Sequence, residues 1–162
     1  MKAISISLLV LTVLAVPLLV ADSPPRPDLQ ARVSSVLERF PAEKPAVRDA
    51  LCAELLGLGP AAVAEVCARV QPPGKGDDSR ARFALNGLAV YVTRPGAEKE
   101  RAPFARSLLG CLDRTKDEPV AAFLLSQVQV AGRKESVPAL SKYLVDDDLA
   151  GPAAAALVSI GG

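Results

Sequence analysis

The chain has 162 residues, of which half are apolar, only 4% are aromatic and none is His. The absence of His excludes Ser-His-Asp and Cys-His nucleophile pairs, and every zinc site that needs a His ligand. Basic residues number 19 and acidic residues 18, so the chain lacks the basic surplus that nucleic-acid binders normally carry. Composition therefore predicts one domain with an aliphatic core and no nucleic-acid partner.

Residues 1–21 have the pattern of a secretory signal peptide. Lys2 supplies the positive start, a nearly unbroken apolar stretch follows, and Ala21 offers a small residue at a cleavage site. Leu19 fits the small-x-small cleavage rule poorly, so an uncleaved N-terminal anchor is the alternative. The stretch is short for a bilayer span of about 20 residues, which favours cleavage. We expect a secreted or periplasmic protein with no membrane insertion beyond this segment.

Eight amphipathic helical patterns follow a Pro-rich linker at 22–27. Apolar residues recur every three or four positions, which is the period of a helix, and Pro or Gly interrupts the pattern between segments. No stretch alternates apolar and polar residues over enough length to predict a strand. The chain is therefore predicted to be all-α, with helices at about 28–40, 47–58, 60–70, 84–92, 97–112, 120–132, 137–144 and 149–160.

Two sets of apolar positions recur at the spacing of helix-pair repeats. One set shifts by 30 residues as a block, so that Val33, Val36, Leu37 and Phe40 become Val63, Val66, Cys67 and Val70. The other starts at Leu55 and Leu58 and recurs 30, then 40, then 32 residues further on, at Leu85 and Leu88, Leu125 and Val128, and Leu157 and Ile160. Such periods predict an α-solenoid, in which each helix pair buries its apolar face by stacking on a neighbour. We expect about four stacked antiparallel pairs over 28–162.

The last predicted helix, GPAAAALVSI, lacks the polar outer face that a terminal repeat needs for solubility. Either a partner protein, a second copy of the chain or a further part of a longer protein would cover it. We favour the last of these, which makes the chain a fragment truncated at its C-terminus. Self-association through the uncapped C-terminal repeat is the alternative.

Three cysteines, Cys52, Cys67 and Cys111, leave at least one free thiol or an intermolecular bond in an oxidising compartment. Cys52 and Cys67 lie equally far from the Gly-Pro turn at 59–60. In an antiparallel hairpin such residues sit at the same height, so one prediction is a Cys52–Cys67 disulfide. The other is that both are small core residues, because Cys67 takes the position that Leu37 fills one repeat earlier. We favour the second.

Acidic clusters precede several of the predicted helices. Asp146, Asp147 and Asp148 form the densest one, but the glycine and distal glutamate of the common calcium loop are missing. Acidic pairs occupy the corresponding places in earlier repeats, at 77–78 and 117–118, which predicts helix capping. The segment PGKG at 73–76 lacks the spacing of a phosphate loop and is predicted to be a surface loop. We therefore expect no metal, no cofactor and no catalytic residue.

Positive charge gathers in the second and third repeats, with acidic residues among the cations. The cations are Arg80, Arg82, Arg94, Lys99 and Arg101, and the acids are Asp77, Asp78, Glu98 and Glu100. This mixture predicts a solvated face, with a site for an anionic partner as the alternative.

The chain resembles the HEAT-repeat proteins, and most closely the short HEAT-like repeats named after phycobilisome lyases. The resemblance is carried by SVPALSKYLVDDDLAGPAAAALVSIGG at 136–162 and AVRDALCAELLGLGPAAVAEVCARV at 46–70. It implies an α-solenoid, and it implies an Arg near the start of each second helix that pairs with an acid of a neighbouring repeat. Arg48 fills that position once, whereas Asp78, Glu118 and Ala150 stand at the equivalent places.

The pattern and the resemblance together predict a non-catalytic protein–protein interaction scaffold that is exported from the cytoplasm. In this fold the second helices line the concave face, so Arg48, Arg82 and Asn86 are the candidate partner-binding residues. The identity of the protein partner does not follow from the sequence. The alternatives are a lyase-like HEAT protein, the helical arm of a larger secreted enzyme, and a structural spacer at the cell surface.

Overall fold

The computed structural model describes residues 27–161, in which every regular element is a helix. This confirms the predicted all-α class for that part of the chain. The signal peptide expected at 1–21 and nearly all of the linker expected at 22–27 lie outside the described residues. The α-helices are α1 (Pro27–Leu37), α2 (Pro45–Gly57), α3 (Pro60–Ala68), α4 (Ser79–Tyr91), α5 (Glu98–Leu112), α6 (Glu118–Ala131), α7 (Val137–Ser141) and α8 (Ala150–Gly161).

The seventh predicted helix, at 137–144, is broken into short pieces. A 3-10 turn, η1 (Lys134–Ser136), precedes α7, and a second one, η2 (Lys142–Val145), follows it. Leu140 is the buried residue of α7, and η2 buries none. Helix length in proteins depends mainly on burial of an apolar face, so this segment has little to hold it in a longer α-helix.

The acidic residues before α6 and α8 act on backbone N–H groups, as the capping prediction requires. The Asp117 carboxylate accepts a hydrogen bond from Val120 N at 3.1 Å, and it occupies the N-cap of α6. The Asp146 carboxylate accepts from Leu149 N at 3.0 Å in the turn before α8. Asp78 stands at the N-cap of α4, but its carboxylate accepts from Gln71 N instead of from the first turn of the helix.

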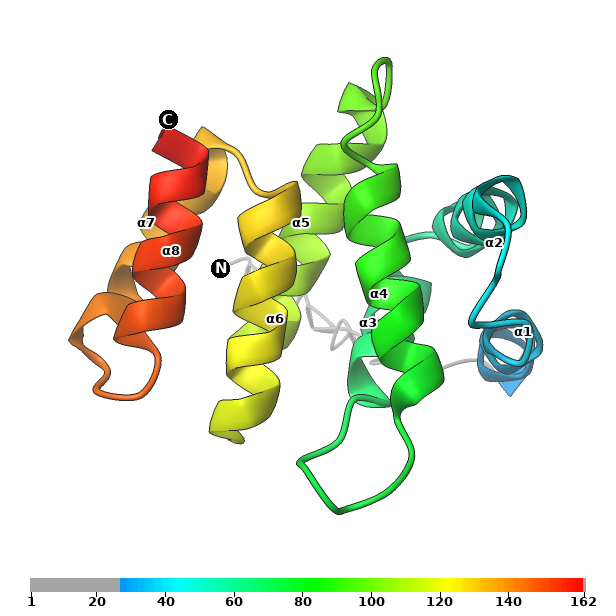
Figure 1. The fold of residues 1–162 in the computed structure, drawn as a ribbon, viewed down its shortest axis with the longest axis horizontal. Coiled ribbons are helices and arrows are strands. Elements are labelled where there is room, and N and C mark those ends of the chain that lie inside the picture. Colours follow the sequence, from blue (N-terminus) through cyan, green and yellow to red (C-terminus); the bar gives the residue numbers. More distant parts are fainter. Residues whose placement is uncertain (1–26, 162) are drawn as a thin grey trace, which may run out of the picture.

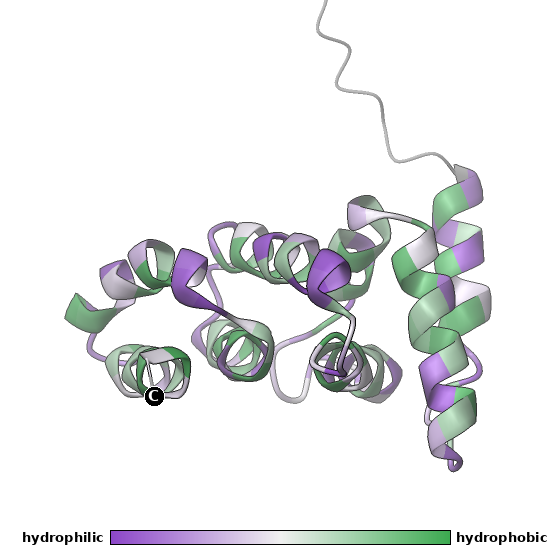
Figure 2. Cartoon of the chain, turned by 90° about the horizontal axis from the view of Figure 1, so that it is seen from above, coloured by the Kyte–Doolittle hydropathy of each residue, from purple (hydrophilic) through white to green (hydrophobic). Residues whose placement is uncertain are grey.

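The helices form two rows. Odd-numbered helices contact the next odd-numbered one, from α1 through α3 to α5, and even-numbered helices do the same from α2 to α8. Consecutive helices also contact each other, α1 with α2, α3 with α4, α5 with α6 and α7 with α8. Figure 1 shows α4, α6 and α8 side by side, and Figure 2, seen from above, shows a second row behind them.

The first helix pair departs from this regular arrangement. Figure 1 shows α1 and α2 end-on, whereas α3 to α8 run along the page. The axes of α2 and α3 are bent by 111° at their junction, so these two helices do not fold back on each other as the antiparallel hairpin expected at 59–60 would. Gly59 at this junction has a φ of 89°, a backbone conformation that glycine adopts without strain.

One continuous apolar core runs through both rows. The first repeated set is entirely buried, from Val33 and Phe40 in the first pair to Val63 and Val70 in the second. Burying one such aliphatic side chain contributes about 1.5–3 kcal/mol, so these positions supply much of the stability. Most of the second set is buried too, namely Leu55, Leu85, Leu88, Leu125 and Val128, while Leu58, Leu157 and Ile160 are partly buried.

Two glycines let neighbouring even-numbered helices approach closely. A Cβ at Gly87 would lie 3.3 Å from the Cys52 sulfur and 3.4 Å from Arg48 Cγ, so α4 packs tightly on α2. A Cβ at Gly132 would lie 2.8 Å from Ile160 Cδ1, closer than real Cβ atoms come to a neighbour. The even-numbered row is therefore spaced by backbone at these points rather than by side chains.

Arg101 of α5 caps the C-terminal end of α6. Its Nε donates to Ala131 O at 2.7 Å, and its Nη2 donates to Gly132 O at 3.0 Å and to Val130 O at 3.2 Å. The last carbonyls of a helix have no partner within the helix, and a cation also interacts favourably with that end of the helix dipole. One side chain thus satisfies three carbonyl groups and joins α5 to α6.

We predict that Arg101→Met lowers the free energy of unfolding by about 2 kcal/mol, because the carbonyls lose hydrogen bonds from a charged donor. Urea denaturation followed by circular dichroism measures the effect. Arg106→Met is the matched control, since Arg106 is an exposed arginine of the same helix. Equal stability of the two variants would contradict the capping role.

Asp113, at the C-terminal end of α5, holds the last part of the chain. Its carboxylate accepts hydrogen bonds from the Lys142 ammonium and, at 2.9 Å, from the Tyr143 hydroxyl, both in η2. The hydrogen bond from Lys142 is the main reason that the pKa of Asp113 lies below its ordinary value, and Tyr143 adds to it. A carboxyl group whose pKa is lowered by folding stabilises the folded state above its unfolded-state pKa, and that contribution is lost as the pH falls.

We predict that Asp113→Asn lowers the free energy of unfolding at pH 7 by about 0.5–1 kcal/mol, the usual size for a half-exposed ion pair. The difference from the unmodified chain should shrink as the pH falls below about 4, where carboxyl groups take up protons. Urea denaturation at several pH values measures it, with Asp147→Asn, at an exposed aspartate, as the control. A difference that persists unchanged at about pH 2 would refute the ionic origin.

Candidate functional site

The even-numbered row presents an outer surface without charged side chains, which we call the uncharged face. It consists of exposed residues at three- and four-residue spacing on α4, α6 and α8, so each set lies on one side of its helix. Phe83, Val90 and Val130 are 53%, 42% and 40% exposed. The face comprises Phe83, Asn86 and Val90 of α4, Ser126, Gln129 and Val130 of α6, and Ala155 and Val158 of α8.

The uncharged face is continuous across helices. α4 contacts α6 and α6 contacts α8, and the three lie side by side in Figure 1. Gln129 Nε2 donates to Ser159 Oγ at 3.2 Å, which links the exposed sides of α6 and α8. Single exposed apolar residues are ordinary on a protein surface, but a contiguous apolar patch indicates an interaction site. The face can therefore offer apolar contact together with the amide and hydroxyl groups of Asn86 and Ser126.

Of the three predicted partner-binding residues, Asn86 lies on the uncharged face. Arg48 lies where α2 meets α4, with its aliphatic stem against Gly87. Its guanidinium donates to the Asp49 carboxylate at 2.7 and 3.0 Å, so it pairs with its neighbour in sequence. The pairing with an acid of a neighbouring repeat that the HEAT resemblance implies is not the one observed for Arg48.

Arg82 lies at the edge of the uncharged face and is fully engaged within the chain. Its Nε donates to Asp78 Oδ2 at 2.7 Å and its Nη2 to Gln71 O at 3.0 Å. The guanidinium also lies 4.5 Å from the ring centroid of Phe123 on α6, a cation–π contact. Arg82 therefore fixes the 71–78 loop and joins α4 to α6, and it presents little free charge to a partner.

The other cations of the predicted mixed face are also occupied. Arg94 lies 2.7 Å from a Glu100 carboxylate oxygen, with its guanidinium 3.5 Å from the Tyr91 ring centroid. Arg101 caps α6, as described above. These contacts agree with the interpretation of a mixed, internally paired surface.

A cavity of about 220 Å³ lies between α5 and η1. Arg101, Arg106 and Arg133 line it, together with Glu135 and the buried Ser136. Arg101 is already bonded to three carbonyls, which leaves two guanidinium groups and one carboxylate at the cavity. This mixed set does not select a ligand of one charge.

Cys52 and Cys67 are buried, and the predicted disulfide between them is not present in the structure. Because α2 and α3 meet at 111°, positions equidistant from their junction do not face each other. Cys52 lies beneath Gly87 of α4, whereas the thiol of Cys67 is hydrogen-bonded to Cys111 of α5. The alternative prediction, that both are core residues, matches their burial.

Among residues 27–161, no three His, Cys, Asp or Glu side chains gather in a way that could hold a metal ion. Within the same range, no single helix is long and apolar enough to cross a membrane. α2 and α3 together reach that length and composition, but they are bent by 111°.

The residues that sequence reasoning missed are Phe83, Val90 and Val130 of the uncharged face, and Arg114 beside Cys111. The signal for the first three was an apolar residue on the otherwise polar side of a predicted helix. Comparison of the chain with protein-family models, with curated proteins and with solved structures found no match.

Proposed function

We propose that this chain is a non-catalytic protein-interaction scaffold, built as a HEAT-like α-solenoid and exported from the cytoplasm. The contacts between alternate helices support the solenoid, since pair-on-pair packing of this kind is what stacked repeats require. The apolar leader pattern at 1–21 supports export. The four pairs of the solenoid would be α1 with α2, α3 with α4, α5 with α6, and α7 with α8.

The uncharged face is the observation that carries the proposed function. Phe83, Val90 and Val130 keep 40% or more of their surface in water although the chain has a well-filled core beside them. Covering the exposed remainder of such a side chain is worth on the order of 1 kcal/mol. Three helices present these residues on one surface, which is the arrangement that a docked segment of another protein can cover.

The chemistry of the face specifies the partner. Arg82 and Arg94, the nearest cations considered in the sequence, are already paired with Asp78 and Glu100. A partner recognised through ion pairs would therefore find little free charge here. We propose an apolar segment of another protein, held by burial of Phe83 and Val90 and by hydrogen bonds to Asn86 and its polar neighbours.

Binding should fail in the double variant Phe83→Glu with Val90→Glu, because two carboxylates would be desolvated in the interface. The test captures partners from the extracytoplasmic fraction on immobilised residues 22–162 and identifies them by mass spectrometry. Val47→Glu with Val145→Glu is the matched control, since both are exposed valines outside the face.

We expect a stoichiometric protein on the unmodified chain and on the control, and its loss from the Phe83/Val90 variant. Its retention in 0.5 M salt, roughly, should be unchanged, because apolar burial is not screened by ions. Equal capture by all three chains would contradict the proposed face. A dimer of the chain that only the control disrupts would point to self-association through the C-terminal pair instead.

A further inference from the structure

Two of the three cysteines meet where α3 contacts α5. Cys67 is in the last turn of α3 and Cys111 in the last turn of α5, and the two helices are neighbours in the odd-numbered row. The Cys67 thiol is hydrogen-bonded to the Cys111 sulfur. The two side chains are 6% and 7% exposed, so each is buried but reaches the surface.

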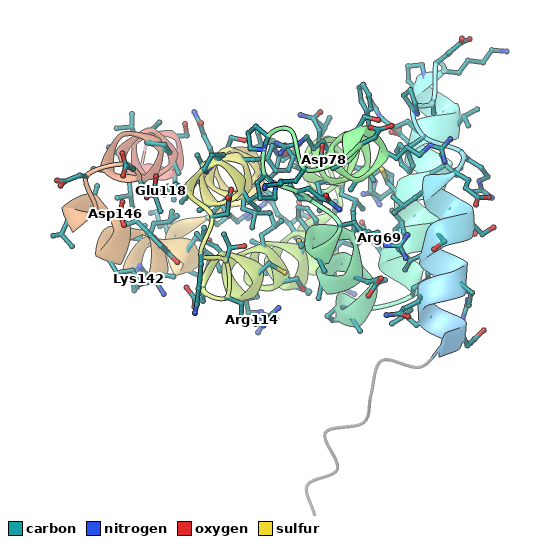
Figure 3. The ribbon with its side chains drawn as sticks, turned by 90° about the horizontal axis from the view of Figure 1, so that it is seen from below. Arg69, Asp78, Arg114, Glu118, Lys142 and Asp146 are labelled. Carbon is teal, nitrogen blue, oxygen red and sulfur yellow. The ribbon has the colours of Figure 1, made fainter. Side chains whose placement is uncertain are left out.

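The cysteine pair faces a small open pocket with a guanidinium group at its edge. The pocket has a volume of about 200 Å³, and its lining includes Cys67, Cys111, Arg114 and Thr115. Arg114 Nη2 lies 3.6 Å from the Cys111 sulfur and donates a hydrogen bond to it. Figure 3 shows Arg114 on the outer side of this row of helices, where a small solute can approach.

The surroundings make the two thiols unequal. The hydrogen bond from Cys67 lowers the pKa of Cys111, and the positive charge of Arg114 lowers it further. The same hydrogen bond, together with burial, raises the pKa of Cys67. Because the thiolate is the nucleophilic form, Cys111 is suited to attack and Cys67 to respond afterwards.

Cys52 has neither of these features. It is completely buried beneath Gly87, and burial raises its pKa to about 12. A buried thiol in apolar surroundings is inert. Of the three cysteines, Cys52 is therefore the one left without a partner.

We propose that Cys67 and Cys111 form a redox-active pair, which a hydroperoxide oxidises to a disulfide that joins α3 to α5. The Cys111 thiolate attacks one peroxide oxygen, the O–O bond breaks, and hydroxide leaves and takes up a proton. This gives a sulfenic acid on Cys111. The Cys67 sulfur then attacks the Cys111 sulfur, the S–O bond breaks, and the Cys67 proton leaves with the hydroxyl group as water. In sum, two thiols and one hydrogen peroxide give one disulfide and two waters.

The first test oxidises the reduced chain with hydrogen peroxide at neutral pH and maps its peptides by mass spectrometry without reduction. We expect a Cys67–Cys111 disulfide and an unmodified Cys52. In Cys67→Ser, which cannot complete the second step, dimedone should trap a sulfenic acid on Cys111. Oxidation of Cys52 as fast as that of Cys111, or the absence of a Cys67–Cys111 disulfide in the unmodified chain, would overturn the proposal.

The second test measures the contribution of Arg114. Arg114→Met should slow sulfenic acid formation on Cys111 by about threefold to tenfold, since it removes the cation that favours the thiolate. Arg106→Met removes the same charge from the same helix, away from this pocket, and should leave the rate unchanged. Equal rates in the two variants would overturn the role assigned to Arg114.

Discussion

The structure depends on one constraint, which is that no helix pair can bury its apolar side alone. Each helix carries apolar residues on the sides that face its partner and the next helix of its row, and the core continues through both rows. Where two helices of a row come closest, Gly87 and Gly132 leave room for the neighbouring side chains. The uncharged face and the cysteine pair both follow from this arrangement, because each is assembled from helices that stacking places side by side.

Arginine side chains bonded to backbone carbonyls join segments that are distant in sequence. Arg101 reaches the end of α6, Arg82 reaches Gln71 O, and Arg69 of α3 donates to Gln30 O of α1 at 3.2 Å. Such contacts replace the continuous ladder of arginine–acid pairs that the HEAT resemblance implies. They also use up the positive charge that the sequence places near the second and third repeats, which leaves apolar contact as the main means of recognition.

Much of the secondary structure could be predicted from the sequence. The period of the apolar residues gave most helices, and the acidic residues gave a true N-cap at Asp117. The break in the seventh helix was missed, because periodicity does not report how little of η2 is buried. The candidate site was predicted only at Asn86. Arginines look free in a sequence, whereas Arg48 and Arg82 are engaged by groups that only the fold brings to them.

The cysteines show the same limit. Counting residues from a turn assumes that the two helices fold back on each other, and the 111° bend between α2 and α3 removes that assumption for Cys52 and Cys67. The contact that forms instead, between Cys67 and Cys111, joins positions in successive repeats of one row. A bend angle is set by packing against all neighbours, so local sequence does not specify it.

Native-state hydrogen exchange, resolved by residue, tests the central claim that each pair is stabilised by its neighbours. If it is correct, amides of α4, α5 and α6, which have helices on both sides, exchange most slowly, and exchange becomes faster in steps toward α1 and α8. A single uniform protection across all helices, or the strongest protection at either end, would contradict it.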